Sequence, residues 1–275
     1  MKKITLILLS VLTLTWVSCS SEKDNPATAE NDESWRLEGD RSIYGLACEG
    51  FTDSVVVLLP SDCSDPITFD IIKAMQAHRV LGMIKVGDNI AIVPNEEDST
   101  VADVVIDIDQ LKGTWCYIVW PKLRESRQTA ERDRVLSKEK TDSIMEMFYV
   151  PREYGFSMKR QWQARSVGYV PENNLENSPV EYPKLGYFTE WHLLNGQLVI
   201  TSGQPVLDEE TGERHVTNLR NDTCDILLLG PDTLVLASEG AQRGYYRIEN
   251  ESDANKKARE IAEKRRQKAL DDIKN

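Results

Sequence analysis

The chain has 275 residues, with 33 Lys and Arg against 45 Asp and Glu, which gives a formal net charge of −12. Hydrophobic residues make up 40% of it, enough to bury a core, so a wholly disordered chain is excluded. The acidic balance argues against nucleic-acid binding, because phosphate recognition needs a basic surface. With three histidines and five scattered cysteines, we expect neither a metal site nor a cofactor.

Residues 1–18 are typical of an export signal. Lys2 and Lys3 precede an apolar stretch over 4–17, which is shorter than the ~20 residues of a membrane-spanning helix. The stretch Trp16–Cys19, with a small residue before the cysteine, resembles the lipobox of bacterial lipoproteins. The cysteine of a lipobox receives a diacylglycerol, with fatty acids such as palmitate, and becomes the new N-terminus. The resemblance implies a lipid anchor at Cys19; an ordinary secretory signal with an incidental cysteine is the alternative.

Residues 19–34 predict a flexible acidic tether. They contain no aromatic or large aliphatic residue, so they cannot bury enough surface to fold. Ser20 stands where some lipoproteins carry the aspartate that retains them in the inner membrane. We therefore expect a protein of the cell envelope, attached to the outer membrane through its lipid, on either its periplasmic or its exposed face.

Residues 35–110 predict a small β domain. Six short stretches rich in β-branched residues are separated by turn formers, as in a small barrel or sandwich. Residues 67–79 are compatible with a strand or a helix, which periodicity leaves open. Asp107 and Asp109 alternate with apolar residues and predict an acidic, wet strand face. The expected strands are Ser42–Cys48, Ser54–Leu59, Ile67–Met75, Val80–Val86, Asn89–Val93 and Ala102–Ile108.

Residues 111–250 predict a second β body, whose clearest element is a hairpin over Tyr187–Ser202. Asn195 and Gly196 supply the positive φ angles of a two-residue type I′ turn. That turn sets the register and places His192 on the wetter face of the hairpin. The residues expected on its apolar face are Trp191, Leu193, Leu198 and Ile200.

A second hairpin is expected over Asp225–Ser238, turning at 230–233. Both of its faces are apolar, so we expect the first domain or an intervening helix to cover the outer one. A charged, glycine-free stretch between Trp120 and Phe148 predicts that helical insert, and residues 251–275 predict a charged C-terminal helix. One face of the hairpin is expected to carry Leu227, Leu229, Leu234 and Leu236, and the other Ile226, Leu228 and Val235.

The second body opens with a Gly-x-Trp motif at 113–115, continues through the two hairpins and ends with Tyr-Tyr-Arg-Ile at 245–248. In this order the motifs resemble the lipocalin-like domains found in many Gram-negative lipoproteins. The resemblance covers about half the chain and implies a mainly β protein ending in an antiparallel meander barrel. It also implies that Trp115 closes one barrel end and that Arg247 packs on it as a cation–π pair.

Cysteines beyond the expected anchor allow disulfides, because export leads to an oxidising compartment. We expect one bond between Cys48 and Cys63 within the first domain. A second is expected between Cys116 and Cys224, since the first and last strands of a closed meander are neighbours. Free thiols at all of these positions are the alternative.

The sequence carries no motif of a familiar active site. A Gly-x-Ser-x-Gly elbow, a His-Glu-x-x-His pair and a Cys-x-x-Cys pair are all missing from it, so we expect no enzyme. A barrel of eight strands can hold one small molecule, and Trp162, Tyr187 and Trp191 are the candidate lining for an apolar or amphipathic ligand. These aromatics would otherwise fill a ligandless core. The alternative function is a structural or assembly lipoprotein that contacts other envelope proteins.

Overall fold

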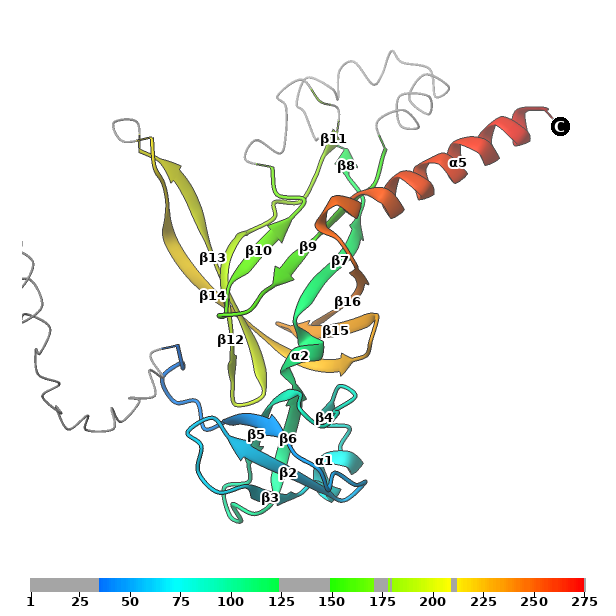
Figure 1. Cartoon of the computed structure of the whole chain (residues 1–275). Helices are drawn as coiled ribbons and strands as arrows, with labels where there is room; N and C mark the ends of the chain where they lie inside the picture. The colour runs from blue at the N-terminus through cyan, green and yellow to red at the C-terminus, as the bar shows by residue number, and fades with distance from the viewer. Residues whose placement is uncertain (1–34, 124–148, 171–177, 179, 209–211, 275) are drawn as a thin grey trace, which may run out of the picture. The chain divides into compact units, whose positions relative to one another are not determined.

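The computed structural model describes residues 35–123, 149–170, 178, 180–208 and 212–274 (Figure 1). The expected anchor at Cys19 lies outside the described residues. Most of the helical insert expected between Trp120 and Phe148 also lies outside them, and its described start forms the strand Lys122–Leu123 and not a helix. The chain is mainly β, with a six-stranded sheet, then an eight-stranded barrel and a C-terminal helix. The expected fold class is therefore confirmed.

The six-stranded sheet has the strand order β3-β2-β1-β5-β6-β4. Residues 67–79, left open by periodicity, divide into a strand and the short helix α1. A bridge between Asp70 and Val101 brings the end of β3 back toward the start of β6, so the sheet curls around its own core. Its strands are β1 Ile43–Ala47, β2 Val55–Pro60, β3 Ile67–Asp70, β4 Val80–Leu81, β5 Asn89–Pro94 and β6 Ala102–Asp107.

The eight-stranded sheet is an up-and-down meander with the order β10-β9-β7-β16-β15-β14-β13-β12. Strands next to each other in the sequence pair antiparallel, and the last strand pairs with the first. The strands are β7 Gly113–Val119, β9 Arg152–Met158, β10 Ala164–Val167, β12 Tyr187–Leu194, β13 Gln197–Leu207, β14 Arg214–Leu229, β15 Thr233–Ser238 and β16 Ala241–Ile248.

The barrel is nearly closed, with its seam between β10 and β12. A single antiparallel bridge joins Gln163 to Glu190, and the Trp191 amide donates to the Trp162 carbonyl at 2.8 Å. Both contacts join β12 to the turn between β9 and β10, so this turn is where the seam is held together. Outside the two main sheets lie β8 Lys122–Leu123, β11 Val180–Glu181, α1 Ile72–Gln76, α2 Ile108–Leu111, the 3₁₀ turn Glu251–Asp253 and α5 Lys256–Lys274.

The Gly-x-Trp motif and the late arginine meet at one end of the barrel, as the resemblance implied. Trp115 is fully buried, and the guanidinium carbon of Arg247 lies 4.1 Å from the centroid of its ring. Arg247 also donates from Nη1 to the Lys112 carbonyl at 2.8 Å and from Nη2 to the Gln110 carbonyl. One arginine thus covers the tryptophan and satisfies carbonyls at the end of α2.

The hairpin at Asn195 has the expected type I′ turn and register. Asn195 and Gly196 have φ of 51° and 85°, and Leu193 faces Leu198 across the strands. The expectation for His192 was wrong, because this side chain is 9% exposed rather than on a wet face. The ring of Trp162 covers it, with centroids 5.6 Å apart.

The second hairpin forms, with Leu229, Leu234 and Leu236 together on its buried face as expected. The expected faces were wrong for Ile226 and Leu227. The register shifts between Ile226 and Leu228, so a bulge at Leu227 reverses the alternation along β14. Ile226 faces the core, whereas Leu227 and Leu228 are 42% and 49% exposed. The first domain therefore does not cover Leu228, and the helical insert, which was the other expected cover, lies outside the described residues.

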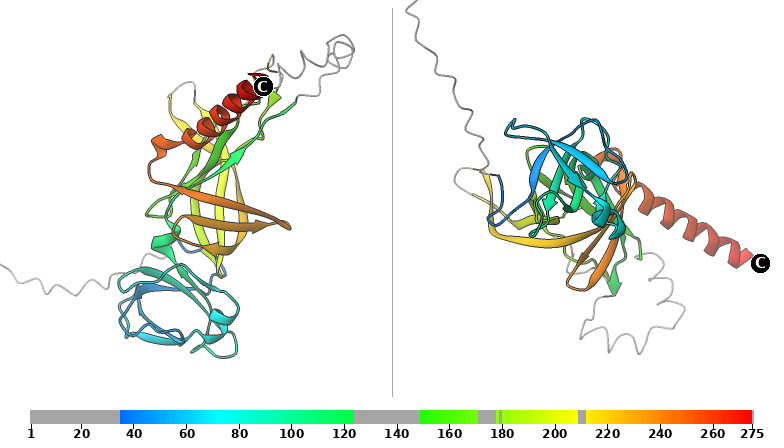
Figure 2. Two further views of the ribbon diagram at one scale, coloured as in Figure 1. Left: turned by 90° about the vertical axis from the view of Figure 1, so that its right-hand side faces the viewer. Right: turned by 90° about the horizontal axis from the view of Figure 1, so that it is seen from below.

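Strands β5 and β6 of the six-stranded sheet are buried on both faces, because the sheet lies across one end of the barrel (Figure 2). Along β6, Val105 belongs to the core of the sheet itself, and Val104 and Ile106 belong to the core shared with the barrel. The expected acidic face was therefore wrong for Asp107, which is buried and accepts a hydrogen bond from the Gln110 amide at the start of α2. Burial raises the pKa of this carboxyl group.

The C-terminal helix α5 starts on a buried carboxylate of the barrel. Glu153 is fully buried, and it accepts hydrogen bonds from the Tyr246 hydroxyl at 2.5 Å and from the Asn255 amide. Ala258 is buried in the first turns, and most of the following residues are exposed. Among the described residues, no helix is both long and apolar enough to cross a membrane.

We predict that Gly113→Ala destabilises the protein. Gly113 has φ of 135°, and a Cβ there would overlap Nη1 of Arg247, so the arginine would have to leave Trp115. The free energy of unfolding, measured with urea, should fall by about 2 kcal/mol or more. Gly244→Ala is the matched control on β16, because nothing lies within 4 Å of a Cβ built there. Equal losses in both variants would contradict this account of the motif.

Candidate functional site

A cleft of about 640 Å³ opens between the six-stranded sheet and the covered end of the barrel. The sheet, the helix α2 and the turn between β9 and β10 all contribute to its wall. The size falls within the range of sites for small organic ligands. The residues that line it are Trp35, Tyr44, Gly45, Ser61, Gly87, Asn89, Ile90, Ile108, Asp109, Lys112, Lys159, Arg160, Gln161, Trp162 and Trp191.

Four aromatic side chains meet in this cleft, and Trp162 is at their centre. Its ring is stacked on Trp35, with centroids 4.6 Å apart and planes 15° apart. Tilted and edge-on contacts follow with Trp191 at 4.8 Å and Tyr44 at 5.9 Å. Trp35 and Trp162 remain partly exposed, whereas Trp191 is buried. The cleft therefore exposes part of the Trp35 and Trp162 rings to solvent, and Trp162 packs against the buried rings of Tyr44 and Trp191.

The turn that carries Trp162 has a strained backbone. Gln161 and Trp162 have φ of 56° and 59°, a conformation that costs roughly 1–2 kcal/mol for each residue with a side chain. Two hydrogen bonds hold the turn: the Lys159 amide donates to the Gln163 carbonyl at 2.8 Å, and Trp191 Nε1 donates to the Lys159 carbonyl at 3.0 Å. Strain of this kind is common where a binding surface is preorganised.

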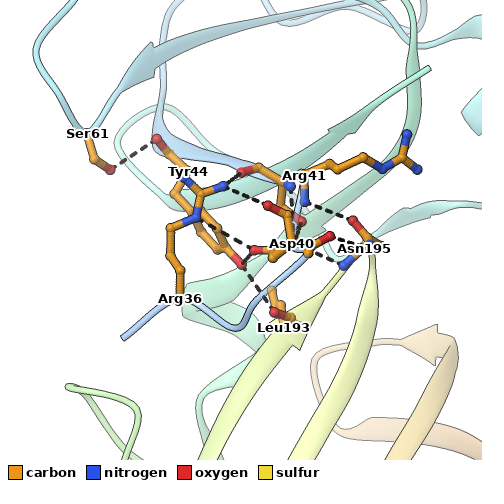
Figure 3. A network of polar contacts seen from close by, with 9 residues as sticks. Arg36, Asp40, Arg41, Tyr44, Ser61, Leu193 and Asn195 are labelled. Atoms are coloured by element: carbon orange, nitrogen blue, oxygen red, sulfur yellow. Dashed lines mark hydrogen bonds and ion pairs between the residues drawn. The ribbon is translucent and has the colours of Figure 1, made fainter. Parts of the chain in front are cut away.

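A buried carboxylate positions the chain that leads from Trp35 (Figure 3). The Asp40 side chain is 0% exposed. It accepts from the Ser42 amide and hydroxyl at 3.1 and 2.7 Å, from the Tyr44 hydroxyl at 2.7 Å and from the Asn195 amide at 3.0 Å. Asp40 thus joins β1, which carries Tyr44, to the tip of the β12–β13 hairpin.

Further hydrogen bonds repeat this link between the sheet and the barrel. The Arg41 amide donates to Asn195 Oδ1 at 2.9 Å, and Asn195 Nδ2 donates to the Gly39 carbonyl at 3.1 Å. Arg36 Nη2 donates to the Ser42 carbonyl at 2.6 Å.

Burial raises the pKa of Tyr44, and the hydrogen bond to the Asp40 carboxylate and its charge add to the effect. The Tyr44 hydroxyl therefore remains a neutral donor.

Charged groups stand on one side of the cleft. Lys112 Nζ lies 2.7 Å from Asp109 Oδ1, and Lys159 Nζ lies 2.8 Å from Glu251 Oε1. Burial alone would raise the pKa of Asp109, but hydrogen bonds from Asn89 and Lys112 outweigh burial and lower it. Asp109 is therefore a carboxylate at neutral pH, and it balances the charge of its lysine.

The structure brings together two of the three expected lining residues. Trp162 and Trp191 line the cleft, whereas Tyr187 lies at the far end of β12 and contacts Tyr169, with ring centroids 5.2 Å apart. Sequence reasoning missed Trp35 and Tyr44. Trp35 is the first aromatic residue after the tether, which is the one signal that could have drawn attention to it.

The covered half of the barrel interior is filled by the protein's own side chains. Inward-facing residues of seven barrel strands are almost completely buried and form one cluster with the six-stranded sheet. The cleft lies beside this packed interior and not inside it. The barrel residues that fill the space include Trp115, Phe156, Met158, Trp191, Leu193, Leu198, Ile200, Leu234 and Leu236.

The four cysteines expected in disulfides are free thiols in the structure. Cys116 is on β7 and Cys224 on β14, with β16 and β15 between them. The first and last barrel strands are indeed neighbours, but Cys224 is not on the last one. Cys48 lies beside β1, and Cys63 is exposed. Burial raises the pKa of Cys116 to about 12, so this thiol stays protonated and unreactive.

The described lining of the cleft offers aromatic rings, amides and charged side chains. Within the described ranges, no group of three or more His, Cys, Asp or Glu side chains is placed to hold a metal ion. The described lining of the cleft contains one carboxylate and neither histidine nor cysteine. The arrangement can stack a flat or apolar group and pair with a charge.

We predict that Asp40→Ala weakens the junction between sheet and barrel. The substitution leaves four hydrogen-bond donors without their buried acceptor, so the free energy of unfolding should fall by about 3 kcal/mol. Glu96→Ala is the control, because it removes a surface ion pair with Arg41 at 2.9 Å and should cost under about 1 kcal/mol. Urea unfolding measures both, and similar small losses would contradict the assigned role of Asp40.

Comparison with known proteins yields one likeness of fold. No protein-family model matches the chain, and no curated protein matches it. Among solved structures, the chain is similar to a lipocalin-like protein from Bacteroides thetaiotaomicron VPI-5482, with 17% identity over 48% of this chain and 94% of that one and a TM-score of 0.25. At these values the likeness carries no information about a ligand, and the description of the barrel depends on its own strand pairing.

Proposed function

We propose that this protein is a lipid-anchored protein of the cell envelope that binds a small amphipathic ligand and does not convert it chemically. The observation that carries the proposal is the aromatic cleft between the six-stranded sheet and the barrel. It combines a volume of about 640 Å³ with partly exposed indoles. Aromatic surface together with polar groups that can orient a ligand is typical of ligand sites.

The preorganisation of the cleft supports a binding role. Trp162 is held in a left-handed backbone conformation and stacked on Trp35, and the buried Asp40 carboxylate fixes the chain next to Trp35. A rigid site loses little conformational entropy when a ligand binds. The strain in the turn is then the cost of presenting an indole to the ligand.

The absence of reactive groups in the described lining supports binding over catalysis. General acid–base and nucleophilic mechanisms need a positioned proton acceptor or nucleophile. The lining offers lysines, an arginine, amides, the Ser61 hydroxyl, the Tyr44 hydroxyl that already donates to Asp40, and a carboxylate that already pairs with Lys112. These groups recognise and orient a ligand.

We predict that Trp162→Leu weakens ligand binding in the cleft, because the substitution removes the central ring of its aromatic cluster. The probe is the neutral dye phenylnaphthylamine, titrated into the purified full chain and followed by its fluorescence. Its affinity should weaken about tenfold or more, since stacking and buried area are lost together. Tyr187→Leu is the control, because Tyr187 lies outside the cleft, and it should leave the affinity unchanged.

Unchanged binding in Trp162→Leu would contradict the proposed site. A second surface would then become the stronger candidate: Leu227 and Leu228, which are exposed on the outer side of β14. Exposed apolar residues side by side favour a protein contact. That result would move the assignment toward a structural or assembly role at the envelope.

The lipid anchor is tested separately at Cys19. We predict that Cys19→Ser abolishes labelling of the protein with radioactive palmitate in the native host and moves it from the membrane fraction to the soluble fraction. The reason is that the hydroxyl of serine does not replace the thiol that accepts the lipid. Retention of label and membrane association in this variant would contradict the anchor, while leaving the binding site untouched.

A further inference from the structure

The cleft contains a positive charge that no neighbouring group balances. Two of the three cations in its lining are paired, Lys112 with Asp109 and Lys159 with Glu251. The third, Arg160, is exposed and has no hydrogen bond or ion pair to any described residue. Its guanidinium group is therefore available to a ligand.

The position of Arg160 is set by the same turn that presents Trp162. Arg160 directly precedes the two left-handed residues, Gln161 and Trp162. The preceding residue, Lys159, is held at its carbonyl by Trp191 Nε1 at 3.0 Å. The arginine and the indole thus project from one short, braced segment, so a ligand on Trp162 lies within reach of a cation.

The net charge of the whole chain has the opposite sign to Arg160. The protein carries a formal net charge of −12, which repels anions over most of its surface. An arginine without a described partner in the lining favours an anionic ligand over a neutral or cationic one. A guanidinium group can donate two parallel hydrogen bonds to two oxygens of one carboxylate, sulfonate or phosphate group.

We infer that the ligand of the cleft is a flat organic anion, whose apolar ring lies on the indoles of Trp35 and Trp162 and whose acidic group pairs with Arg160. This inference rests on the proposed binding function and adds the chemical class of the ligand. The paired lysines at the same rim lower the cost of bringing a negative charge into the cleft. Affinity for such a ligand falls as salt is added, because the partner charge is exposed.

Two dyes that differ in one acidic group test the inference. Anilinonaphthalene sulfonate carries a sulfonate, and phenylnaphthylamine has the same aromatic skeleton without it. Both are titrated into the purified full chain, into Arg160→Gln, and into Arg165→Gln as the matched control. Arg165 is an exposed arginine on β10 that is not part of the cleft lining.

The expected result is a selective loss. Arg160→Gln should weaken the affinity for the sulfonate dye about tenfold and leave the neutral dye within about twofold of its original affinity, while Arg165→Gln changes neither. Added salt should weaken the sulfonate dye alone. If both dyes bind the cleft equally well and Arg160→Gln affects neither, the ligand class is wrong and the binding function stands. If neither dye responds to Trp162→Leu, the binding function itself fails.

Discussion

The buried contact between the six-stranded sheet and the end of the barrel is the constraint on which the other features depend. Strands β5 and β6 contribute alternate residues to two cores: Ile92 and Val105 pack inside the sheet, and Val93 and Val104 pack against the barrel. Residues on both strand faces are therefore removed from water, which adds a large apolar area to the stability of the junction. The tip of the β12–β13 hairpin contacts Val104 directly, since a Cβ at Gly196 would lie 3.1 Å from its Cγ2.

This contact also explains why the candidate site lies where it does. The interior at that end of the barrel is filled by residues such as Trp115 and Leu234, both 0% exposed, so a ligand finds no space there. At the edge of the junction the two curved bodies separate, and the aromatic residues that would continue the core remain partly exposed. Trp35 and Trp162 are packed against the shared core and face the opening. The candidate cleft thus forms at the margin of the packed interface.

Polar groups give the junction its specific geometry. Asp40 is a fully buried carboxylate whose four donors come from β1 and from the hairpin tip. A buried charge is tolerated when such hydrogen bonds replace its hydration. On the other side of the barrel, Glu153 plays a similar part at the start of α5. Each carboxylate fixes one element against the barrel, where apolar contact alone would permit sliding.

The sequence by itself determined the elements whose rules are local: most of the short strands, the type I′ turn at Asn195 and its register, and the Trp115–Arg247 pair that the resemblance implied. Only the tertiary structure decided which strand faces are buried, because burial depends on which element packs against each face. The amphipathic alternation around Asp107 has the same appearance whether its polar side meets water or a helix start, and the bulge at Leu227 reverses a face without any glycine or proline to mark it. The cleft required Trp35 to meet Trp162 across more than a hundred residues, a contact set by packing between distant segments, which no local pattern records.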